Sequence, residues 1–149
     1  MTTANIDSVC AACKRSWPIE LVQEISKNKL TWRERFECEC GHGFQAAGVG
    51  LPVPGVRRAL LEQLGTTVAW VDQAKSKPLA AQTMSMITGL DEATFTTALK
   101  KLPTKIYEGT EVEAEFVAAG LARAGATVRL VAPKPKKPKP RSKATLRRK

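Results

Sequence analysis

The chain has 149 residues and a mass of 16.2 kDa, enough for one ordinary domain or two small ones, and its 43% apolar and 26% charged residues are typical of a globular protein. Because no apolar run approaches the 18 residues of a membrane-spanning helix and residues 1–8 do not resemble a secretory signal, we expect a cytoplasmic protein without a membrane partner. The net charge of +10 lies almost entirely in residues 133–149, whose nine Lys or Arg residues and no acid leave fifteen bases against fourteen acids elsewhere.

Four cysteines form two close pairs near the N-terminus: Cys10 and Cys13 in a C-x-x-C motif, and Cys38 and Cys40 in a C-x-C motif. Disulfides are rare in the reducing cytosol, and close cysteine pairs separated by a short module have the spacing of metal ligands. Two facing turns that each carry two thiolates can surround zinc in a tetrahedron, which leaves no open coordination position for catalysis. We therefore predict a structural zinc ion bound by all four cysteines.

The cysteines have other interpretations. A redox pair usually lies in a thioredoxin-like βαβ pattern, which the residues around Cys10 do not show, and unpaired core cysteines would not need this pairing. An iron–sulfur cluster uses the same ligand type, and spacing alone does not distinguish it from zinc. His42, the only histidine, follows Cys40 by two residues and either replaces one thiolate or stays exposed at the turn.

The residues between and after the pairs predict a small metal-bound module. Residues 18–26 begin with Pro and have apolar residues at helical spacing, which predicts a helix. Residues 32–46 alternate apolar and charged residues around a glycine-rich turn, which predicts a hairpin. The expected apolar core of this module consists of aromatic residues: Trp17, Trp32, Phe36 and Phe44. The motifs C-x-x-C and F-x-C-x-C-G-H-x-F resemble a zinc ribbon, a class found in translation, transcription and adaptor proteins. We assign the zinc ribbon to residues 1–46.

Residues 47–65 are expected to be a linker rich in Gly and Pro, followed by a short helix, so that the cores on its two sides are separate. Residues 66–132 then predict a compact α+β domain in the order β-α-α-β-α-β. The expected elements are residues 66–71, 78–87, 92–102, 105–107, 110–124 and 126–131. Its expected core is apolar: Phe95, Leu99, Leu102, Phe116, Val128 and Leu130.

Short motifs in this domain occur in a characteristic order: Thr88-Gly89-Leu90, then Pro103, Glu108-Gly109, Ala114-Glu115 and Ala124-Gly125-Ala126-x-Val128. In this order they resemble the C-terminal domain of the bacterial ribosomal stalk protein, the seven/twelve protein of the large subunit. The resemblance implies a βααβαβ fold, which the adaptor of the Clp protease shares. Fold alone therefore does not settle function.

The resemblance also implies a partner-binding face on the first two helices of the domain, where the family recruits translation factors. Lys77 matches a lysine of that face, whereas Gln82 and Ser85 stand where the family has further basic residues. A zinc ribbon takes the place of the dimerisation helices that precede this domain in the stalk protein. We therefore expect an accessory protein that uses the stalk fold, rather than the stalk protein itself.

We expect a disordered, Lys/Pro-rich basic tail over residues 133–149, because this composition cannot bury a core. Its cations can bind phosphates and release counterions, which predicts sequence-independent, salt-sensitive nucleic-acid binding. The predicted nucleic-acid-binding residues are Lys134, Lys136, Lys137, Lys139, Arg141, Lys143, Arg147, Arg148 and Lys149. A solubilising tail, or one that binds an acidic protein or anionic lipid, is the alternative, and Lys14, Arg15, Arg33 and Arg35 of the ribbon would then be the next candidates for nucleic-acid binding.

No pairing of a nucleophile or acid with a base predicts an active site, and no small-molecule substrate is evident. We therefore expect a non-enzymatic protein that binds zinc, associates with the ribosome or translation, and binds RNA through its tail. The alternatives are a protein–protein adaptor and a DNA-associated regulator, each with the same fold and no ribosomal role.

Overall fold

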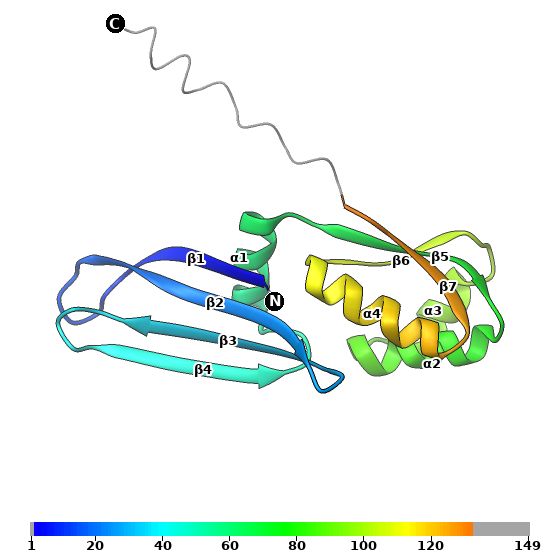
Figure 1. The fold of residues 1–149 in the computed structure, drawn as a ribbon, viewed down its shortest axis with the longest axis horizontal. Helices are drawn as coiled ribbons and strands as arrows, with labels where there is room; N and C mark the ends of the chain where they lie inside the picture. Colours follow the sequence, from blue (N-terminus) through cyan, green and yellow to red (C-terminus); the bar gives the residue numbers. More distant parts are fainter. Residues whose placement is uncertain (1, 133–149) are drawn as a thin grey trace, which may run out of the picture.

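The computed structural model describes residues 2–132, so residue 1 and the predicted basic tail, residues 133–149, lie outside the described residues. The described part is a mixed α+β structure with two antiparallel sheets and four helices (Figure 1). The elements in chain order are β1 (Thr2–Val9), β2 (Ser16–Ser26), β3 (Lys29–Glu37), β4 (Gly43–Val49), α1 (Pro54–Leu64), β5 (Thr67–Ala74), α2 (Lys77–Thr88), α3 (Glu92–Ala98), β6 (Thr104–Gly109), α4 (Glu111–Arg123) and β7 (Ala126–Val131). None of these helices is long and apolar enough to cross a membrane.

The first sheet is a meander in which each strand pairs with the next, in the order β1-β2-β3-β4. The hairpin between β2 and β3 turns on two residues, Lys27 and Asn28, whose φ angles are 51° and 63°. Positive φ at both central residues is the turn geometry that matches the twist of two paired strands. The predicted hairpin over residues 32–46 is confirmed and is longer than expected, because β3 and β4 pair from Thr31–Val49 to Glu37–Gly43.

The helix predicted over residues 18–26 is wrong, because this segment is the second strand of the sheet. It pairs with β1 on one side and β3 on the other, so its backbone groups are satisfied from both directions. Leu21, Val22 and Gln23 are all buried in this interior strand. Helical spacing of apolar residues is a local signal, and here two neighbouring strands override it.

The second sheet has the order β6-β5-β7, and Figure 1 shows α2, α3 and α4 gathered on one side of it. The element order predicted from the sequence, β-α-α-β-α-β, is confirmed. Helix α4 begins with a capping box, in which the Thr110 side chain accepts a hydrogen bond from the Glu113 N–H and the Glu113 side chain accepts one from the Thr110 N–H. Helix α3 ends at Ala98 rather than at the expected Leu102.

The second sheet and helices α2, α3 and α4 form the second unit of the protein. Its core contains Phe95 and Leu99, as expected, and the partly buried Leu102 and Val128 pack against this core. Phe116 is only half-buried. The prediction that Leu130 belongs to the core is wrong, since its side chain is 39% exposed near the end of β7, an edge strand with a neighbour on one side only.

The short helix predicted within residues 47–65 is present as α1, and both ends of this segment belong to regular elements that contact the first sheet. Strand β4 extends to Val49, and α1 packs Val56 and Leu60 against Ala4 and Leu21 of the first sheet. The apolar clusters of the two units are separate, as expected.

Buried polar side chains nevertheless join the two units. The Glu113 carboxylate on α4 accepts hydrogen bonds from Gln23 on β2 at 2.8 Å and from Arg57 on α1 at 3.0 Å. Tyr107 on β6 donates to the same carboxylate at 2.9 Å, and Thr110 donates to the side-chain oxygen of Gln23. Because Gln23, Thr110 and Glu113 are fully buried, these contacts fix the first sheet against α4.

Candidate metal centre

The two cysteine pairs lie on two turns, each closed by a backbone hydrogen bond to the carbonyl of its first cysteine. In the first turn, the Lys14 N–H donates to the Cys10 carbonyl at 2.9 Å, and in the second the Gly41 N–H donates to the Cys38 carbonyl at 2.9 Å. The residue that follows the second cysteine of each pair has a positive φ, 65° at Lys14 and 95° at Gly41. This left-handed conformation is uncommon outside glycine, so its occurrence at Lys14 indicates that the surrounding structure holds the first turn in place.

The four sulfur atoms converge on one point. Cys10 Sγ lies 3.6 Å from Cys40 Sγ, and Cys13 Sγ lies 3.4 Å from Cys38 Sγ, so each close contact joins one turn to the other. All four sulfur atoms lie within 4.8 Å of one another, and none is in a disulfide. One metal ion could therefore contact all four predicted ligands, although they come from segments far apart in the sequence.

Apolar residues of the first sheet pack against two of the four cysteines. Cys10 and Cys38 are buried in a cluster with Phe36, against which Trp17 and Ile19 pack. Of the four aromatic residues expected in the core, Phe36 is buried, and Trp17 and Trp32 are partly buried. Phe44 is 45% exposed and stacks on Phe36 with ring centroids 5.5 Å apart, because it lies on the edge strand β4.

The thiols differ in their affinity for protons. The Arg15 backbone N–H, and then the Cys38 thiol, lower the pKa of Cys13 to about 6. The Cys40 N–H lowers the pKa of Cys38, but burial and the neighbouring sulfurs together outweigh it and raise this pKa to about 12. A bound cation would favour the thiolate form of all four cysteines.

His42 lies outside the four-sulfur cluster, and its side chain is exposed. It contributes its backbone carbonyl, which accepts a hydrogen bond from the Cys38 N–H at 2.9 Å. A weak ion pair between Arg15 and Glu39, 3.6 Å apart and largely exposed, also connects the two turns. The alternative in which His42 replaces a thiolate is therefore less compatible with this geometry than four cysteine ligands.

The predicted partner-binding residues all lie on α2. Lys77 and Gln82 are exposed, and the half-buried Ser85 donates a hydrogen bond to the Leu90 carbonyl at 2.7 Å. About 100° of helix rotation per residue places Gln82 and Ser85 on neighbouring positions and Lys77 well away from Gln82. The structure therefore does not gather these three side chains into one patch. The nine predicted nucleic-acid-binding residues lie outside the described residues.

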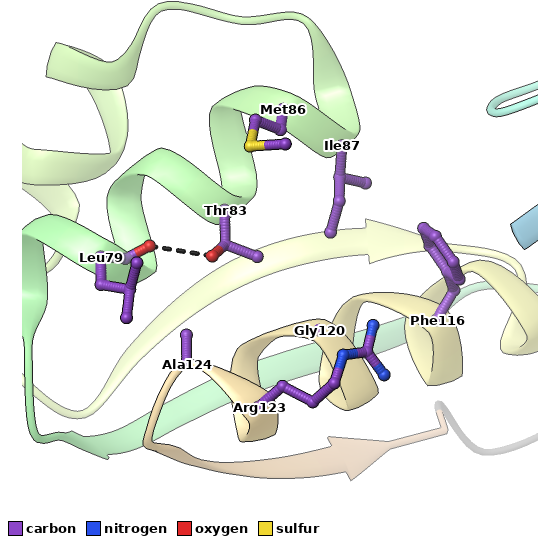
Figure 2. A pocket seen from close by; sticks show the side chains of 8 residues that line it. All are labelled: Leu79, Thr83, Met86, Ile87, Phe116, Gly120, Arg123 and Ala124. Carbon is purple, nitrogen blue, oxygen red and sulfur yellow. Dashed lines mark hydrogen bonds between the residues drawn. The ribbon is translucent and has the colours of Figure 1, made fainter. Parts of the chain in front are cut away.

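Sequence reasoning missed a hollow of about 340 Å³ between α2 and α4. Figure 2 shows side chains from both helices around it, with Leu79 and Ile87 on α2 and Phe116 and Arg123 on α4. Apart from Arg123, its lining has no ionisable side chain, so the hollow has no acid–base pair. The signal in the sequence is the helical spacing of Leu79, Thr83, Met86 and Ile87 along one face of α2, since all four line the hollow and Met86 is 78% exposed.

Protein-family models and curated proteins were compared with the chain, and none matches it. The four cysteines are therefore the strongest functional feature of residues 2–132, because four sulfur atoms this close together can bind a metal ion, and this inference does not depend on a related protein. Thiolate ligands favour borderline and soft metal ions over hard ions such as Mg²⁺ and Ca²⁺. The described part of the chain thus contains a candidate metal centre made of cysteine alone.

Proposed function

We propose that this chain is a non-enzymatic zinc-binding protein that acts at the ribosome and binds RNA through its basic residues 133–149. The observation that carries the proposal is the four-sulfur centre, which has no position left for a substrate when all four sulfurs bind one ion. Such a centre stabilises a small module rather than catalysing a reaction. The chemistry of the protein is then binding, and its charge distribution indicates what it binds.

The sulfur geometry fits a single zinc ion bound by four thiolates. A tetrahedral zinc–thiolate centre with bonds of about 2.3 Å separates its sulfur atoms by about 3.8 Å. The distances between Cys10 Sγ and Cys40 Sγ, 3.6 Å, and between Cys13 Sγ and Cys38 Sγ, 3.4 Å, lie below this value, and the upper limit of 4.8 Å for all pairs lies above it. The zinc-ribbon resemblance of the two motifs supports the same assignment.

Elemental analysis of the purified protein tests the metal. We expect one zinc per chain, lost in Cys38→Ser and kept in the matched variant His42→Ala, since the imidazole lies outside the cluster. Iron with the visible absorbance of a cluster, or no metal at all, would contradict the zinc assignment. Loss of zinc in His42→Ala with an intact fold would show that the histidine is a ligand.

Association with the ribosome is supported by the second unit. The order β5-α2-α3-β6-α4-β7 is the order that the resemblance to the stalk protein implies. Sedimentation through a sucrose gradient tests this part of the proposal, and we expect the full chain to travel with ribosomal particles at low salt. Its absence from those fractions would favour the adaptor or the DNA-associated regulator.

RNA binding is supported by the separation of charge along the sequence. Residues 133–149 carry nine cations and no acid, whereas residues 1–132 have a net charge of only +1. The folded part therefore cannot supply strong non-specific phosphate binding. Removing residues 133–149 should abolish most RNA affinity and most of its salt dependence. For each phosphate that the shortened chain no longer binds, the slope of log affinity against log salt should become shallower by roughly 0.7–0.9. An unchanged slope would show that these residues do not bind RNA, and tighter binding to duplex DNA would favour the DNA-associated regulator.

A further inference from the structure

The free edge of the first sheet, strand β4, differs from the other sheet edges of the described chain. Strand β4 has no charged residue and no proline, and its register with β3 runs without a bulge from Thr31–Val49 to Glu37–Gly43. Charges, prolines and bulges are the features by which proteins prevent edge strands from pairing with other chains. Edge β4 has none of them.

Other edges are covered or charged. Helix α1 reaches two of them, since Gln63 donates to the Asn5 carbonyl on β1 and Arg57 donates to the Glu108 carbonyl on β6 at 3.0 Å. Strand β7 carries Arg129, which is paired with Asp72. The described part of the chain therefore leaves β4 as its unprotected edge.

Two hydrogen bonds show which backbone groups of this edge are free. The Gly50 N–H donates to the Leu30 carbonyl at 2.7 Å, and the Cys38 N–H donates to the His42 carbonyl at 2.9 Å. Because hydrogen-bonded pairs alternate along an antiparallel ladder, the even-numbered residues of β4 bond to β3. The N–H and C=O groups of the odd-numbered residues, including Gln45 and Ala47, therefore point away from the sheet.

We propose that two copies of this chain pair through β4 in antiparallel orientation about a two-fold axis at Ala46. This register places Gln45 opposite Ala47 of the second copy, so that the free backbone groups of one strand meet those of the other. It also places Phe44 opposite Gly48 of the second copy in a non-hydrogen-bonded pair, where side chains are closest. The two four-stranded sheets become one sheet of eight strands, and each chain uses the same surface.

The side chains of β4 are complementary to one another in this register. Phe44 is 45% exposed, and it lies on the same face of β4 as Gly48, four residues further along the strand. At Gly48 a Cβ would lie 2.7 Å from Nε1 of Trp32, so the indole already lies across this glycine. Phe44 of one copy would thus meet the Trp32 ring of the other. No like charges meet, because β4 has no charged side chain.

The association should be weak and should depend on protein concentration, since one strand edge buries less than the area of a stable interface. It should also strengthen with salt, because each chain carries a net charge of +10 and the two copies repel each other. RNA binding has the opposite salt dependence. The dimer and the proposed ribosomal function can therefore fail or succeed separately.

Sedimentation equilibrium of the full, metal-loaded chain tests the dimer. The mass should rise with concentration from 16.2 kDa toward twice that value. Ala47→Pro removes an N–H that points away from β3, and the symmetry removes it twice, so association should weaken about tenfold or more. Ala47→Val is the matched control, because it keeps the N–H and should associate like the native chain.

Amide hydrogen exchange of the native chain provides a test that needs no variant. The amides of Gln45 and Ala47 should exchange fast in dilute solution and slowly in concentrated solution, whereas the amide of Ala46 should be protected throughout by its bond to β3. A constant mass with fast exchange at Gln45 and Ala47 at every concentration would overturn the proposal and leave the edge to an extended strand of another protein. Equal association of a folded Ala47→Pro would also overturn it, because the dimer would then use another surface.

Discussion

Replacing Glu113 with alanine should destabilise both units of the protein, although the residue belongs to the second. The carboxylate is fully buried and accepts hydrogen bonds from Gln23, Arg57, Tyr107 and the Thr110 N–H. These donors come from the first sheet, from α1, and from the second unit. The variant removes their shared acceptor while the donors stay in place.

The expected loss in the free energy of unfolding depends on the donors that Glu113→Ala leaves without an acceptor. Removing one partner of a buried ion pair costs about 3–5 kcal/mol, and the lower end applies here because the Arg57 side chain is 28% exposed and can reach water. The buried amide of Gln23 also loses its acceptor, which adds about 1 kcal/mol. We therefore expect Glu113→Ala to lower the free energy of unfolding by about 3–4 kcal/mol, a large share of the roughly 5–15 kcal/mol of a typical domain.

Three tryptophans allow the two units to be followed separately during denaturation. Trp17 and Trp32 lie on β2 and β3 of the first sheet, and Trp70 lies on β5 of the second. A Trp70→Phe background therefore reports on the first sheet, and a background with Trp17 and Trp32 both replaced by Phe reports on the second. The native chain should give coincident urea midpoints in the two backgrounds, and Glu113→Ala should lower both and separate them.

The isosteric variant Glu113→Gln is the control for packing. It keeps the volume and one acceptor oxygen but removes the charge that faces Arg57, so it should cost about 1.5–3 kcal/mol, less than the alanine variant. If the two urea midpoints of Glu113→Ala stay together and its free energy of unfolding changes by less than about 0.5 kcal/mol, Glu113 does not join the two units.

Three further predictions concern the core, the pH dependence and the metal. Phe95→Ala should cost about 3–5 kcal/mol in a urea melt, because the ring is 6% exposed, and a loss no larger than that of the exposed control Leu130→Ala would contradict this core assignment. Burial, and then the charge of Glu113, raise the pKa of Tyr107 above its ordinary value of 10, so its contribution is complete below pH 10 and is lost as the pH rises further. Between pH 10 and the pKa of Tyr107 in the folded chain, the free energy of unfolding of the native chain should fall more steeply than that of Tyr107→Phe, by about 1.4 kcal/mol per pH unit. Equal slopes for the two proteins would contradict the prediction. Removing the metal with a chelator should destabilise the first sheet. Because Glu113 joins the two units, the unfolding transition reported by Trp70 should shift as well. A Trp70 midpoint that stays constant would show that the two units are independent.

Local patterns in the sequence are sufficient for much of the fold and for the candidate metal ligands. Close cysteine pairs constrain each pair to one turn, so the four sulfur ligands can be predicted without knowledge of the rest of the fold. The element order of the second unit is predictable because Asp91 and Thr110 cap the starts of α3 and α4 and Gly89 caps the end of α2, all by interactions within a few residues.

The tertiary structure decided features that depend on distant partners. Residues 18–26 form a strand because β1 and β3 lie on either side, a circumstance that their own helical spacing does not contain. The same holds for Gln23 and Glu113, 90 residues apart, which have the sequence context of ordinary surface residues until the fold encloses them together. Local capping and turn formation depend on neighbours in sequence, whereas strand pairing and the burial of polar groups depend on neighbours in space, and the latter exist only once the chain has folded.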